Sequence, residues 1–517
     1  MIGSLRFGKR HLYYEREQGN KYMREMSLHN IAASCGGMLH ITGTARLNGV
    51  TEETEVTSAV LDSRKAEQGC LFFATIGERV DGHRFIGQVF EKGASCVITQ
   101  KTPKEVEEEH GISASVWGAY ILVEDTFQAL KDAAEFYRST LNIPVVGITG
   151  SVGKTSTKEF IAGVLAQKYK VLKTEGNFNN EVGLPLTLLR IREEHEAAVV
   201  EMGISDFGEM HRLSKMARPT VCVITNIGQC HLENLKTRDG ILKAKTEIFD
   251  YMDGNGEVCL NGDDDKLCTV TEVNGKRTHF FGLGNHPKEE VFAADIVNRG
   301  LFGSDAVLYF RDGISKEETA KERCDELRQP EQLPVHVPLP GAHMVINAAA
   351  AACVGRLLGL DENEIREGIA AVTPVGGRSH LISTGKYTLI DDCYNANPVS
   401  MKAAVDLLNT ADTRKAAVLG DMFELGVNSD NMHEEVGAYA AKAGLDTIIC
   451  IGENSSSMYR GACREQKSGQ KILYFASKQE FLEKYRKAEE ELFCHRDTIL
   501  IKASHGMGFT EIVEFLQ

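Results

Sequence analysis

Apolar and polar positions along this chain follow two patterns, which predict strands followed by helices. A short β-branched run at 143–146 has the pattern of a buried strand. Apolar residues at the spacing of one helical face come after it, namely Phe160, Ile161, Val164, Leu165 and Tyr169. The same order recurs through the central part of the chain, and alternating strands and helices are typical of a parallel sheet covered by helices. The sequence therefore predicts an α/β fold.

The pattern also predicts how the chain divides into domains. Residues 1–25 are polar and charged and are expected to be a disordered extension or an over-extended translation start. Residues 26–125 predict a small α/β domain, and residues 126–375 predict a central domain with a parallel sheet. Residues 376–517 predict a doubly wound, Rossmann-like domain, although the G-x-G-x-x-G string of dinucleotide binding is missing from its start. Its strands are expected at 388–392, 416–419, 447–451, 472–475 and 498–502, and its helices at 399–409, 430–443, 478–492 and 507–516.

Composition and charge narrow the classes of function. The 517 residues carry a formal net charge of −15, which argues against nucleic acid or an anionic membrane as a partner. No apolar run approaches the length of about 18 residues that predicts a transmembrane helix. The N-terminal stretch lacks the apolar core of a signal peptide. The 13 cysteines are scattered without a C-x-x-C pair, which favours reduced thiols in a cytoplasm over disulfides or a zinc site.

A glycine-rich loop, Gly147-Ile-Thr-Gly-Ser-Val-Gly-Lys-Thr-Ser-Thr157, lies between the predicted strand and helix of the central domain. Strand, glycine loop and helix are the context of a P-loop, in which backbone N–H groups surround phosphate oxygens. Lys154 would reach the β- and γ-phosphates, and Thr155 would bind Mg²⁺. The spacing is a variant, because Ile148 stands where the usual motif has its first glycine. The alternative is a glycine- and serine-rich turn that binds no ligand.

Polar residues near the ends of central elements are further candidates. Glu201 follows the apolar run 197–200, and the carboxyl end of a strand is where ligands bind in an α/β sheet. It is a candidate Mg²⁺ ligand, and the alternative is an exposed strand-end glutamate. Asn177, Asn179 and Asn180 share one short loop, where turn formation is the simple explanation and their number favours substrate contact.

Two basic residues and two polar loops are ambiguous when taken alone. His231 would ordinarily be a hydrogen-bonded loop histidine. Lys245, near the buried edge of a predicted helix, would ordinarily extend its ammonium to solvent. The loops Asp62-Ser63-Arg64 and Asp81-Gly82-His83 can bind a polar or phosphorylated group, but turn and cap roles are the favoured interpretation.

Together, these strings resemble the Mur ligase family over about residues 26–517. Within the family, Tyr394-Asn-Ala-Asn-Pro398 favours the branch that adds D-Ala-D-Ala, and the Asp-Asn-Pro-Arg string of the diaminopimelate-adding branch is missing. The resemblance is carried by 62–64, 77–83, 147–156, 177–185, 201–203, 231–233, 242–249, 376–378, 391–398, 419–426 and 502–507.

The resemblance implies three domains, one for a UDP-sugar, one for ATP and a mobile C-terminal one that closes at a hinge near residue 376. It also implies a reaction in which ATP phosphorylates the terminal carboxylate of UDP-MurNAc-tripeptide. The amine of D-Ala-D-Ala then attacks the acyl phosphate, which gives UDP-MurNAc-pentapeptide, ADP and phosphate. Phosphorylation supplies the leaving group that a carboxylate lacks, so such a site needs Mg²⁺ and fixed cations. A monomer is implied as well.

The resemblance assigns roles to the residues of the central domain. Thr155 and Glu201 would bind one Mg²⁺, and His231 would help to bind a second. Lys245 matches the family's carbamylated lysine. The resemblance thus implies Lys154, His231 and Lys245 as the catalytic residues. The phosphates would be held by Gly150, Ser151, Val152, Gly153, Lys154, Thr155 and Ser156.

The remaining assignments reach into the other two domains. The nucleotide would also be contacted by Asn347, Arg378, Asp392, Tyr394, Asn395 and Asn397. The substrates would be contacted by Ser63, Arg64, Asn177, Asn179, Asn180, Lys502, Ser504 and His505.

One position departs from the family pattern. The family's usual Lys-Gly-Ser-Arg string is Lys502-Ala-Ser-His505 here. Arginine is a permanent, bidentate cation and histidine is neither. If that arginine clamps a carboxylate, binding of the dipeptide is expected to weaken above neutral pH.

Three other functions remain as alternatives. The first is a sibling amide ligase, either another Mur ligase or an enzyme of the folylpolyglutamate synthase type. The second is a P-loop switch that hydrolyses nucleotide to control a partner, and the third is a degenerate homologue that only binds. The N-terminal UDP-sugar strings argue against the first, the third domain argues against the second, and the retained Lys154, Glu201 and Lys245 argue against the third.

Overall fold

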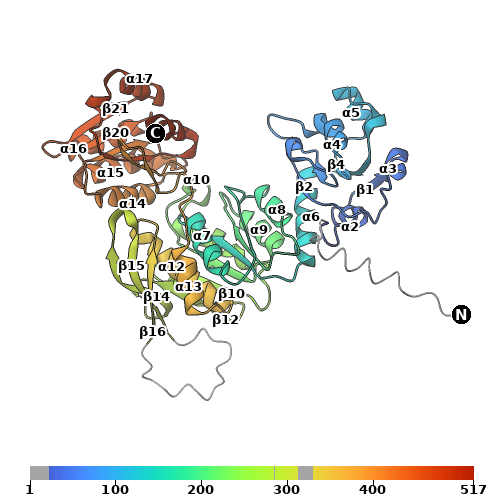
Figure 1. Ribbon diagram of the computed structural model, residues 1–517, viewed down its shortest axis with the longest axis horizontal. Coiled ribbons are helices and arrows are strands. Elements are labelled where there is room, and N and C mark those ends of the chain that lie inside the picture. The colour runs from blue at the N-terminus through green and yellow to red at the C-terminus, as the bar shows by residue number, and fades with distance from the viewer. Residues whose placement is uncertain (1–21, 285, 312–329) are drawn as a thin grey trace, which may run out of the picture.

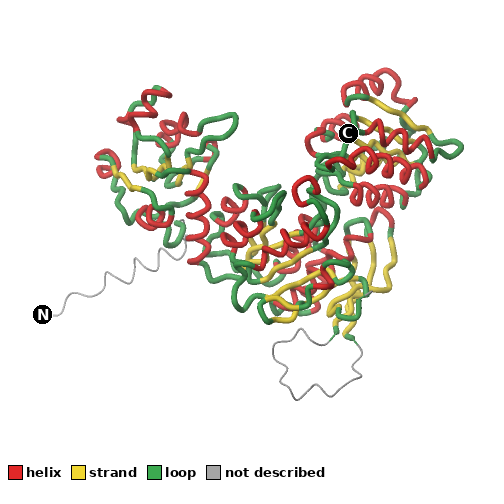
Figure 2. The backbone as a smooth tube through the Cα atoms, turned by 180° about the vertical axis from the view of Figure 1, so that it is seen from behind, coloured by secondary structure: helices red, strands yellow, loops and turns green. Residues whose placement is uncertain are grey.

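Three β-sheets, which follow one another along the chain, organise the computed structural model (Figure 1). The structure describes residues 22–284, 286–311 and 330–517. The central sheet lies between the other two, which stand on opposite sides of it (Figures 1 and 2). The predicted α/β class with three parts is confirmed. None of the helices in the described ranges has the length and apolar character that crossing a membrane requires.

The N-terminal sheet has five strands in the order β1-β5-β4-β3-β2, and β1 alone among them is antiparallel to its neighbour. Successive residues of β3 enter different cores: Leu71 and Phe73 face one cluster, and Phe72 faces the other. Met23 is buried in the first of these clusters, although it falls within the predicted extension, most of which lies outside the described residues. The elements are α2 (Leu28–Ser34), β1 (Met38–Ile41), α3 (Gly43–Leu47), β2 (Ala59–Val60), η1 (Ser63–Lys65), β3 (Leu71–Phe73), η2 (Gly82–Phe85), α4 (Ile86–Glu91), β4 (Cys96–Thr99), α5 (Pro103–His110), η3 (Ala114–Val116) and β5 (Ala119–Leu122).

Helix α6 (Thr126–Thr140) joins this unit to the central one. Asp125 caps its start by accepting hydrogen bonds from two backbone N–H groups. The helix packs against α2 on one side and against α8 and α9 of the central unit on the other. Its buried residues, among them Leu130 and Tyr137, therefore belong to a core that continues from the N-terminal sheet into the central one.

The central sheet has nine strands in the order β16-β15-β14-β13-β10-β9-β6-β8-β7. Strand β6 pairs in parallel with β8 on one side and β9 on the other, so the glycine-rich loop starts at a point where the strand order reverses. Helices α7, α12 and α13 cover one face, and α6, α9 and α11 cover the other. The strands are β6 (Val145–Thr149), β7 (Val171–Lys173), β8 (Ala197–Glu201), β9 (Val221–Ile224), β10 (Glu257–Asn261), β13 (His279–Gly282), β14 (Glu289–Asn298), β15 (Ser304–Phe310) and β16 (Glu331–Val337), beside the hairpin β11 (Glu272–Val273) and β12 (Lys276–Arg277).

One edge of the central sheet differs from the parallel sheet that was predicted. Strands β14, β15 and β16 pair with one another in antiparallel fashion. Every second residue of β15 is buried, which is the alternation of a strand with one covered face. The helices of this unit are α7 (Lys154–Leu165), α8 (Gly183–Leu188), α9 (Glu209–Ala217), α10 (Leu232–Leu235), α11 (Arg238–Thr246), η4 (Glu247–Phe249), η5 (Leu267–Thr269), η6 (Gly300–Phe302), α12 (Ala342–Leu357) and α13 (Glu362–Ala370).

The C-terminal sheet has six strands in the order β17-β18-β22-β19-β20-β21, all parallel except β17. The structure contains each strand and helix that was predicted after residue 388. It adds α16, which the sequence analysis did not predict and whose buried face consists of Met458 and small residues. Gly461 and Gly437 let α15 and α16 approach until an added Cβ would lie 2.0 and 1.8 Å from a backbone oxygen of the facing helix. The elements are β17 (His380–Ser383), β18 (Thr388–Asp391), α14 (Pro398–Asn409), β19 (Lys415–Gly420), η7 (Gly426–Asn428), α15 (Ser429–Lys442), β20 (Thr447–Ile451), α16 (Ser455–Arg464), β21 (Lys471–Phe475), α17 (Lys478–Ala488), η8 (Glu489–Glu491), β22 (Thr498–Lys502), η9 (His505–Met507) and α18 (Thr510–Leu516).

Candidate active site

The glycine-rich loop runs from the end of β6 to the first residue of α7, as the sequence predicts. Gly150 and Gly153 have φ of 151° and 85°, backbone conformations that glycine adopts without strain. A side chain at Gly150 would also collide with Thr225, because an added Cβ would lie 1.9 Å from its Oγ1. The loop therefore requires glycine at these positions, and the α7 N-terminus opens directly from it.

The neighbouring strand end holds this loop in place. The backbone N–H of Val152 donates to the Asn226 side-chain oxygen at 3.0 Å, and the Asn226 amide and Thr225 hydroxyl donate back to the Val152 carbonyl. The Lys154 ammonium folds back and donates to the Gly150 carbonyl at 2.8 Å. Residues that follow β9 thus hold the loop in place. The Lys154 ammonium bonds a carbonyl of the same loop, and a ligand can easily replace that carbonyl.

Glu201 is buried at the carboxyl end of β8, next to the loop. One carboxylate oxygen accepts a hydrogen bond from the Thr155 hydroxyl at 2.7 Å, and the other accepts one from the Asn179 amide at 2.8 Å. The side chain is 2 % exposed, so it is not the exposed strand-end residue of the alternative interpretation. Two neutral donors leave its negative charge uncompensated, and hard oxygen donors at a pocket are the ligands that Mg²⁺ prefers.

Lys245 lies on the buried face of α11. The side chain is 1 % exposed, so it does not extend to solvent as a lone lysine ordinarily would. The described part of the chain offers its ammonium neither an ion pair nor a hydrogen bond, and burial, helped by the positive charge of Lys154, lowers its pKa to about 7.

Polar groups of the C-terminal unit face the loop from the other side. Lys502, at the end of β22, donates to an Asp392 carboxylate oxygen at 2.6 Å. The other oxygen of Asp392 accepts from the backbone N–H of Ser379. The Arg378 guanidinium lies over the Tyr394 ring at 4.1 Å from its centre. The segment before β17 is therefore bonded to the C-terminal sheet.

These two faces enclose one pocket of about 650 Å³. It contains residues of the loop, of the ends of β8 and β9, and of the first turns of α12 and α14. The predicted site residues in its lining are Ser151, Val152, Gly153, Lys154, Thr155, Ser156, Asn177, Asn179, Asn180, Glu201, His231, Asn347, Arg378, Asp392, Tyr394, Asn395, Asn397 and Lys502.

Several of these residues also have clear local roles. Asn180 accepts hydrogen bonds from two N–H groups at the start of α8, and Asn397 caps α14. Asn347 accepts from the Thr157 hydroxyl and so ties α12 to α7. The turn and cap interpretation therefore holds for Asn180, whereas Asn179 contacts the buried carboxylate of Glu201.

The other predicted residues lie apart from the pocket lining. Gly150 and Lys245 are not lining residues, and Ser504 is buried, where its hydroxyl accepts from the Phe423 N–H. His505 is exposed, with its ring 5.5 Å from that of Tyr394. Ser63 and Arg64 belong to the N-terminal unit, where Arg64 pairs with Asp62. The structure thus gathers the nucleotide candidates and leaves the UDP-sugar candidates in another unit.

The sequence analysis missed three polar pocket residues at strand ends. Thr225 and Asn226 follow β9, and Asn261 ends β10. The rule that ligands bind at the carboxyl ends of parallel strands, which pointed to Glu201, applies equally to them.

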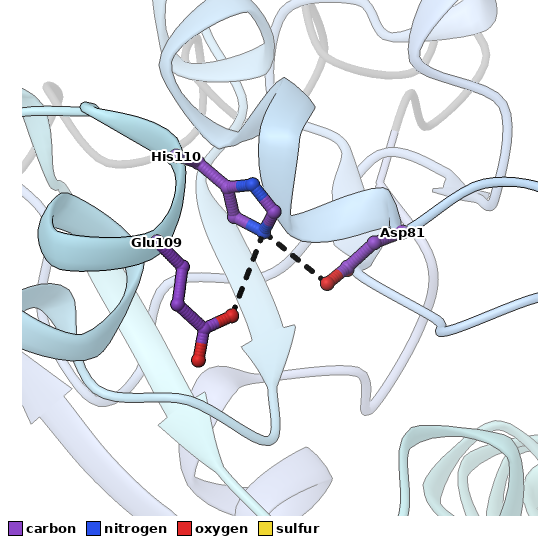
Figure 3. Close-up of side chains that lie close together, drawn as sticks. All are labelled: Asp81, Glu109 and His110. Carbon is purple, nitrogen blue, oxygen red and sulfur yellow. Dashed lines mark hydrogen bonds and ion pairs between the residues drawn. The ribbon is translucent and has the colours of Figure 1, made fainter.

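A second group of metal-ligand type lies in the N-terminal unit. Ligand atoms of Asp81, Glu109 and His110 lie within 4.8 Å of one another (Figure 3). The Lys101 ammonium already bonds both carboxylates, to Asp81 at 2.9 Å and to Glu109. Asp81 also accepts the backbone N–H of His83, the cap role that was favoured for this loop. A lysine thus supplies the positive charge that this group needs.

Comparison with known families defines the class of protein. The model described as Mur ligase family, catalytic domain, matches residues 55–138; that of the Mur ligase middle domain matches 148–355; and that of the Mur ligase, glutamate ligase domain, matches 377–505. The chain belongs to the Mur ligase family.

Within the family, the chain is similar to UDP-N-acetylmuramoyl-tripeptide–D-alanyl-D-alanine ligases. That of Bacillus subtilis (strain 168) is 34% identical over 497 residues, covering 96% of this chain and 99% of the relative. That of Escherichia coli (strain K12) is 32% identical over 476 residues, covering 91% and 96%. A crystal structure of MurF from Acinetobacter baumannii superposes with a TM-score of 0.79 at 29% identity, covering 95% and 98%. MurF from Thermotoga maritima in complex with ADP gives 0.71 at 28% identity, covering 88% and 96%.

Proposed function

We propose that this chain is the ATP-dependent ligase that joins D-Ala-D-Ala to UDP-MurNAc-tripeptide, with UDP-MurNAc-pentapeptide, ADP and phosphate as products. The observation that carries the proposal is the shared pocket. A phosphate-binding loop and a buried carboxylate on the central sheet face a polar strand end of the C-terminal sheet. Such a pocket can hold a nucleotide against a second, incoming group, which is what an acyl-phosphate ligase requires.

The loop would bind the nucleotide phosphates. Lys154 would exchange its contact with the Gly150 carbonyl for phosphate oxygens, and N–H groups at the α7 N-terminus would donate to the same oxygens. Because the loop is already fixed by Thr225 and Asn226, little reorganisation is needed on binding.

Thr155 and Glu201 would hold the first Mg²⁺, and His231 would help to hold the second. The fit rests on the chemistry of the donors, since the Thr155 hydroxyl and the Glu201 carboxylate already lie 2.7 Å apart at the pocket. Mg²⁺ supplies charge compensation for the phosphate oxygens and the developing acyl phosphate. Asn179 orients the Glu201 carboxylate through its amide.

Lys245 would be carbamylated. A pKa of about 7 leaves much of this amine unprotonated at neutral pH, and only the free amine attacks CO₂. The N–C bond forms, a proton leaves, and the buried cation becomes an anion near Lys154. This reaction would remove the repulsion between the two lysines and create an attraction.

The C-terminal unit would complete the site. Arg378, with Asn347, Asp392, Tyr394, Asn395 and Asn397, would contact the nucleotide, while Lys502 keeps Asp392 in place. Residues 376–379 would act as the hinge, because ligand contacts come from both sides of them. Ser63 and Arg64 would bind the UDP-sugar on the N-terminal unit.

Lys502, Ser504 and His505 would lie on the dipeptide side. The His505 ring next to Tyr394 is the group that would meet the dipeptide carboxylate. The Michaelis constant for D-Ala-D-Ala is then expected to rise above neutral pH, because histidine, unlike the arginine of the family pattern, is not a permanent cation. A flat Michaelis constant from about pH 6 to 8.5 would contradict this role.

We also propose that the protein acts as a monomer in the cytoplasm. Every cysteine in the described ranges is a free thiol, which agrees with a reducing compartment.

The test is phosphate release from Mg-ATP by the purified chain, with UDP-MurNAc-tripeptide and with or without D-Ala-D-Ala, while mass spectrometry follows the peptide. Release that depends on both substrates and yields the pentapeptide supports the proposal. Release with another amino acid as acceptor indicates a sibling ligase. Hydrolysis without an amide product indicates a nucleotide switch, and ATP binding without turnover indicates a homologue that only binds.

A further inference from the structure

One side-chain contact joins the central and C-terminal units at the edge of the pocket. The Nδ1 atom of His231 lies 2.8 Å from Oε2 of Glu424. His231 lines the pocket just before α10, and Glu424 lies in the loop between β19 and η7. Helix α10 and η7 are neighbours in space, and Figure 1 shows α10 at the side of the central unit that faces the C-terminal one. The string 419–426 carried part of the family resemblance, but the proposed function leaves it without a role.

Both residues of this contact have unusual backbone conformations. His231 and Glu424 have φ of 50° and 61°, in the left-handed region that residues other than glycine rarely adopt. Such strain persists where the surroundings over-determine it, and it concentrates at functional sites. The contact between the two units is thus made by two residues that both hold strained backbone conformations.

The loop that carries Glu424 is fixed by two hydrogen bonds immediately before it. The N–H of Met422 donates to Nε2 of the buried His433 at 2.9 Å, and the N–H of Phe423 donates to the Ser504 hydroxyl at 2.9 Å. The carboxylate is therefore presented by a rigid loop, although its side chain is 63% exposed. An ordinary surface glutamate has no such support.

We propose that Glu424 is a positioning residue that prepares His231 to bind the metal ion. A carboxylate at Nδ1 favours the tautomer in which Nδ1 carries the proton, and this leaves Nε2 with the lone pair that a metal ligand needs. Because Glu424 belongs to the C-terminal unit, the prepared form of His231 exists only while this unit is docked. Glu424 would thereby couple the position of the C-terminal unit to completion of the metal site.

This inference rests on the proposed metal role of His231 and deepens it. The competing arrangement is a latch, in which Glu424 binds a fully protonated imidazole and keeps it from the metal. The two differ in sign: loss of a positioning carboxylate weakens metal binding, whereas loss of a latch strengthens it.

The experiment measures Mn²⁺ binding by electron paramagnetic resonance in the full chain with ADP present. The variants are E424A, which removes the acceptor, E424Q, which keeps a neutral acceptor, H231A and the double variant. Glu435, another exposed glutamate of the C-terminal unit, provides the matched control E435A. We expect E424A to weaken one Mn²⁺ site about tenfold, which is the low end for loss of a partner of a metal-bound histidine. E424Q should have a smaller effect, E435A none, and the double variant should bind no more weakly than H231A.

A second readout separates positioning from a structural role. Nitrogen-15 spectra of histidine-labelled protein, assigned with H231Q, should show a single Nδ1–H tautomer of His231 in the wild type and a mixture in E424A. A variant that merely lost stability would not change the tautomer at a temperature where it remains folded.

The outcomes are distinguishable from failure of the metal role itself. If H231A weakens Mn²⁺ binding and E424A does not, or if E424A binds Mn²⁺ more tightly, the inference is overturned while the metal role of His231 stands. If H231A binds Mn²⁺ like the wild type, the metal role of His231 is itself wrong, and the inference falls with it.

Discussion

Two polar clusters of this protein contain the same kinds of side chain but treat their charges differently. In the N-terminal cluster, the Lys101 ammonium bonds the carboxylates of Asp81 and Glu109, so each buried or half-buried charge meets an opposite one. The pocket cluster consists of Lys154 and Glu201 in the lining and of Lys245, which lies outside it. The two lysines repel each other, and the hydrogen bonds that the Glu201 carboxylate accepts from described residues come from neutral donors.

The difference between the two clusters indicates which of them is the functional site. A cluster whose charges are compensated within the protein stabilises the fold and has little left to offer a ligand. A cluster that buries charge without compensation is costly to the fold, and the missing charges must come from what binds there. The metal-type geometry of Asp81, Glu109 and His110 is therefore a weaker sign of chemistry than the imbalance around the glycine-rich loop.

The largest expected effect is on Lys154. Changing it to alanine removes the cation that would meet the phosphates, and we expect the rate of pentapeptide formation to fall about a thousandfold, as for loss of one preorganised charge-stabilising group. The unfolding free energy should not fall, because among the described residues Lys154 hydrogen-bonds to the Gly150 carbonyl alone, and its positive charge is unfavourable next to Lys245. The control is K215A, a half-exposed lysine of α9 that pairs with Glu135. More than a tenth of the wild-type rate in K154A would show that the loop does not bind the reacting phosphates.

The next effect concerns Lys245, where activity and stability should move in opposite directions. K245M should lose most of the ligase activity, yet in CO₂-free buffer it should be more stable than the wild type by about 1–3 kcal/mol at pH 6, because a buried charge without a partner is replaced by an apolar side chain.

The pH dependence of that stability difference follows from the pKa of Lys245. The folded-state pKa of about 7 lies below the ordinary value of 10.5, so the unfolded chain holds more protons between these values. The stability of the wild type therefore rises with pH through this window, and the advantage of K245M shrinks. Denaturant titrations at pH 6 and pH 9.5 measure the difference in unfolding free energy between K245M and the wild type. A K245M variant that is less stable than the wild type at pH 6 would show that another group stabilises the Lys245 ammonium.

For Asp81 in the N-terminal cluster we expect the reverse of Lys245, namely that a substitution lowers stability and leaves activity unchanged. Despite partial burial, which acts in the other direction, hydrogen bonds from the His83 N–H and Lys101 hold the pKa of Asp81 well below its usual range. D81N should lower the unfolding free energy by about 1–3 kcal/mol and leave kcat at saturating substrates unchanged.

The stabilising contribution of Asp81 is present above the ordinary aspartate pKa and is lost as the pH falls below it. The gap between wild type and D81N should therefore close in acid. E107Q is the control, because Glu107 is exposed on α5, the helix that carries Glu109 and His110. A large fall in kcat for D81N with unchanged stability would reverse the roles given to the two clusters.

The smallest expected effect tests whether a buried charge without compensation is by itself enough to identify a functional site. Burial, together with the nearby carboxylate of Asp263, raises the pKa of Glu289 to about 7, and this residue lies outside the pocket lining. Its folded-state pKa lies above the ordinary value of 4.5, so the stability of the wild type falls as the pH rises from about 4.5 to 7.

E289Q should remove this decline and leave kcat unchanged, with a gain of about 1 kcal/mol at pH 8. The measurement is a series of denaturant titrations from pH 4.5 to 8. A clear loss of activity in E289Q would mean that the pocket extends to the start of β14.

Much of the fold could be predicted because local pattern and tertiary role agree. The run 143–146, the glycine-rich loop and the helical spacing after it correspond to β6, the loop and α7. The parallel strands of the C-terminal sheet lie at the predicted positions. The exceptions are elements whose patterns depend on a neighbour. Helix α16 buries mostly small residues, which allow close packing against α15, and β14 and β15 form an antiparallel edge through mutual pairing.

By itself, the sequence determined the α/β class, the glycine-rich loop and the candidate residues at strand ends, since these follow from backbone conformation and from side-chain type over a few neighbouring positions. Only the tertiary structure decided which of those residues share the pocket, that Lys245 is buried without a partner among the described residues, and that Glu424 meets His231. Those facts depend on distances and solvation between segments far apart in the chain, and no local pattern encodes them.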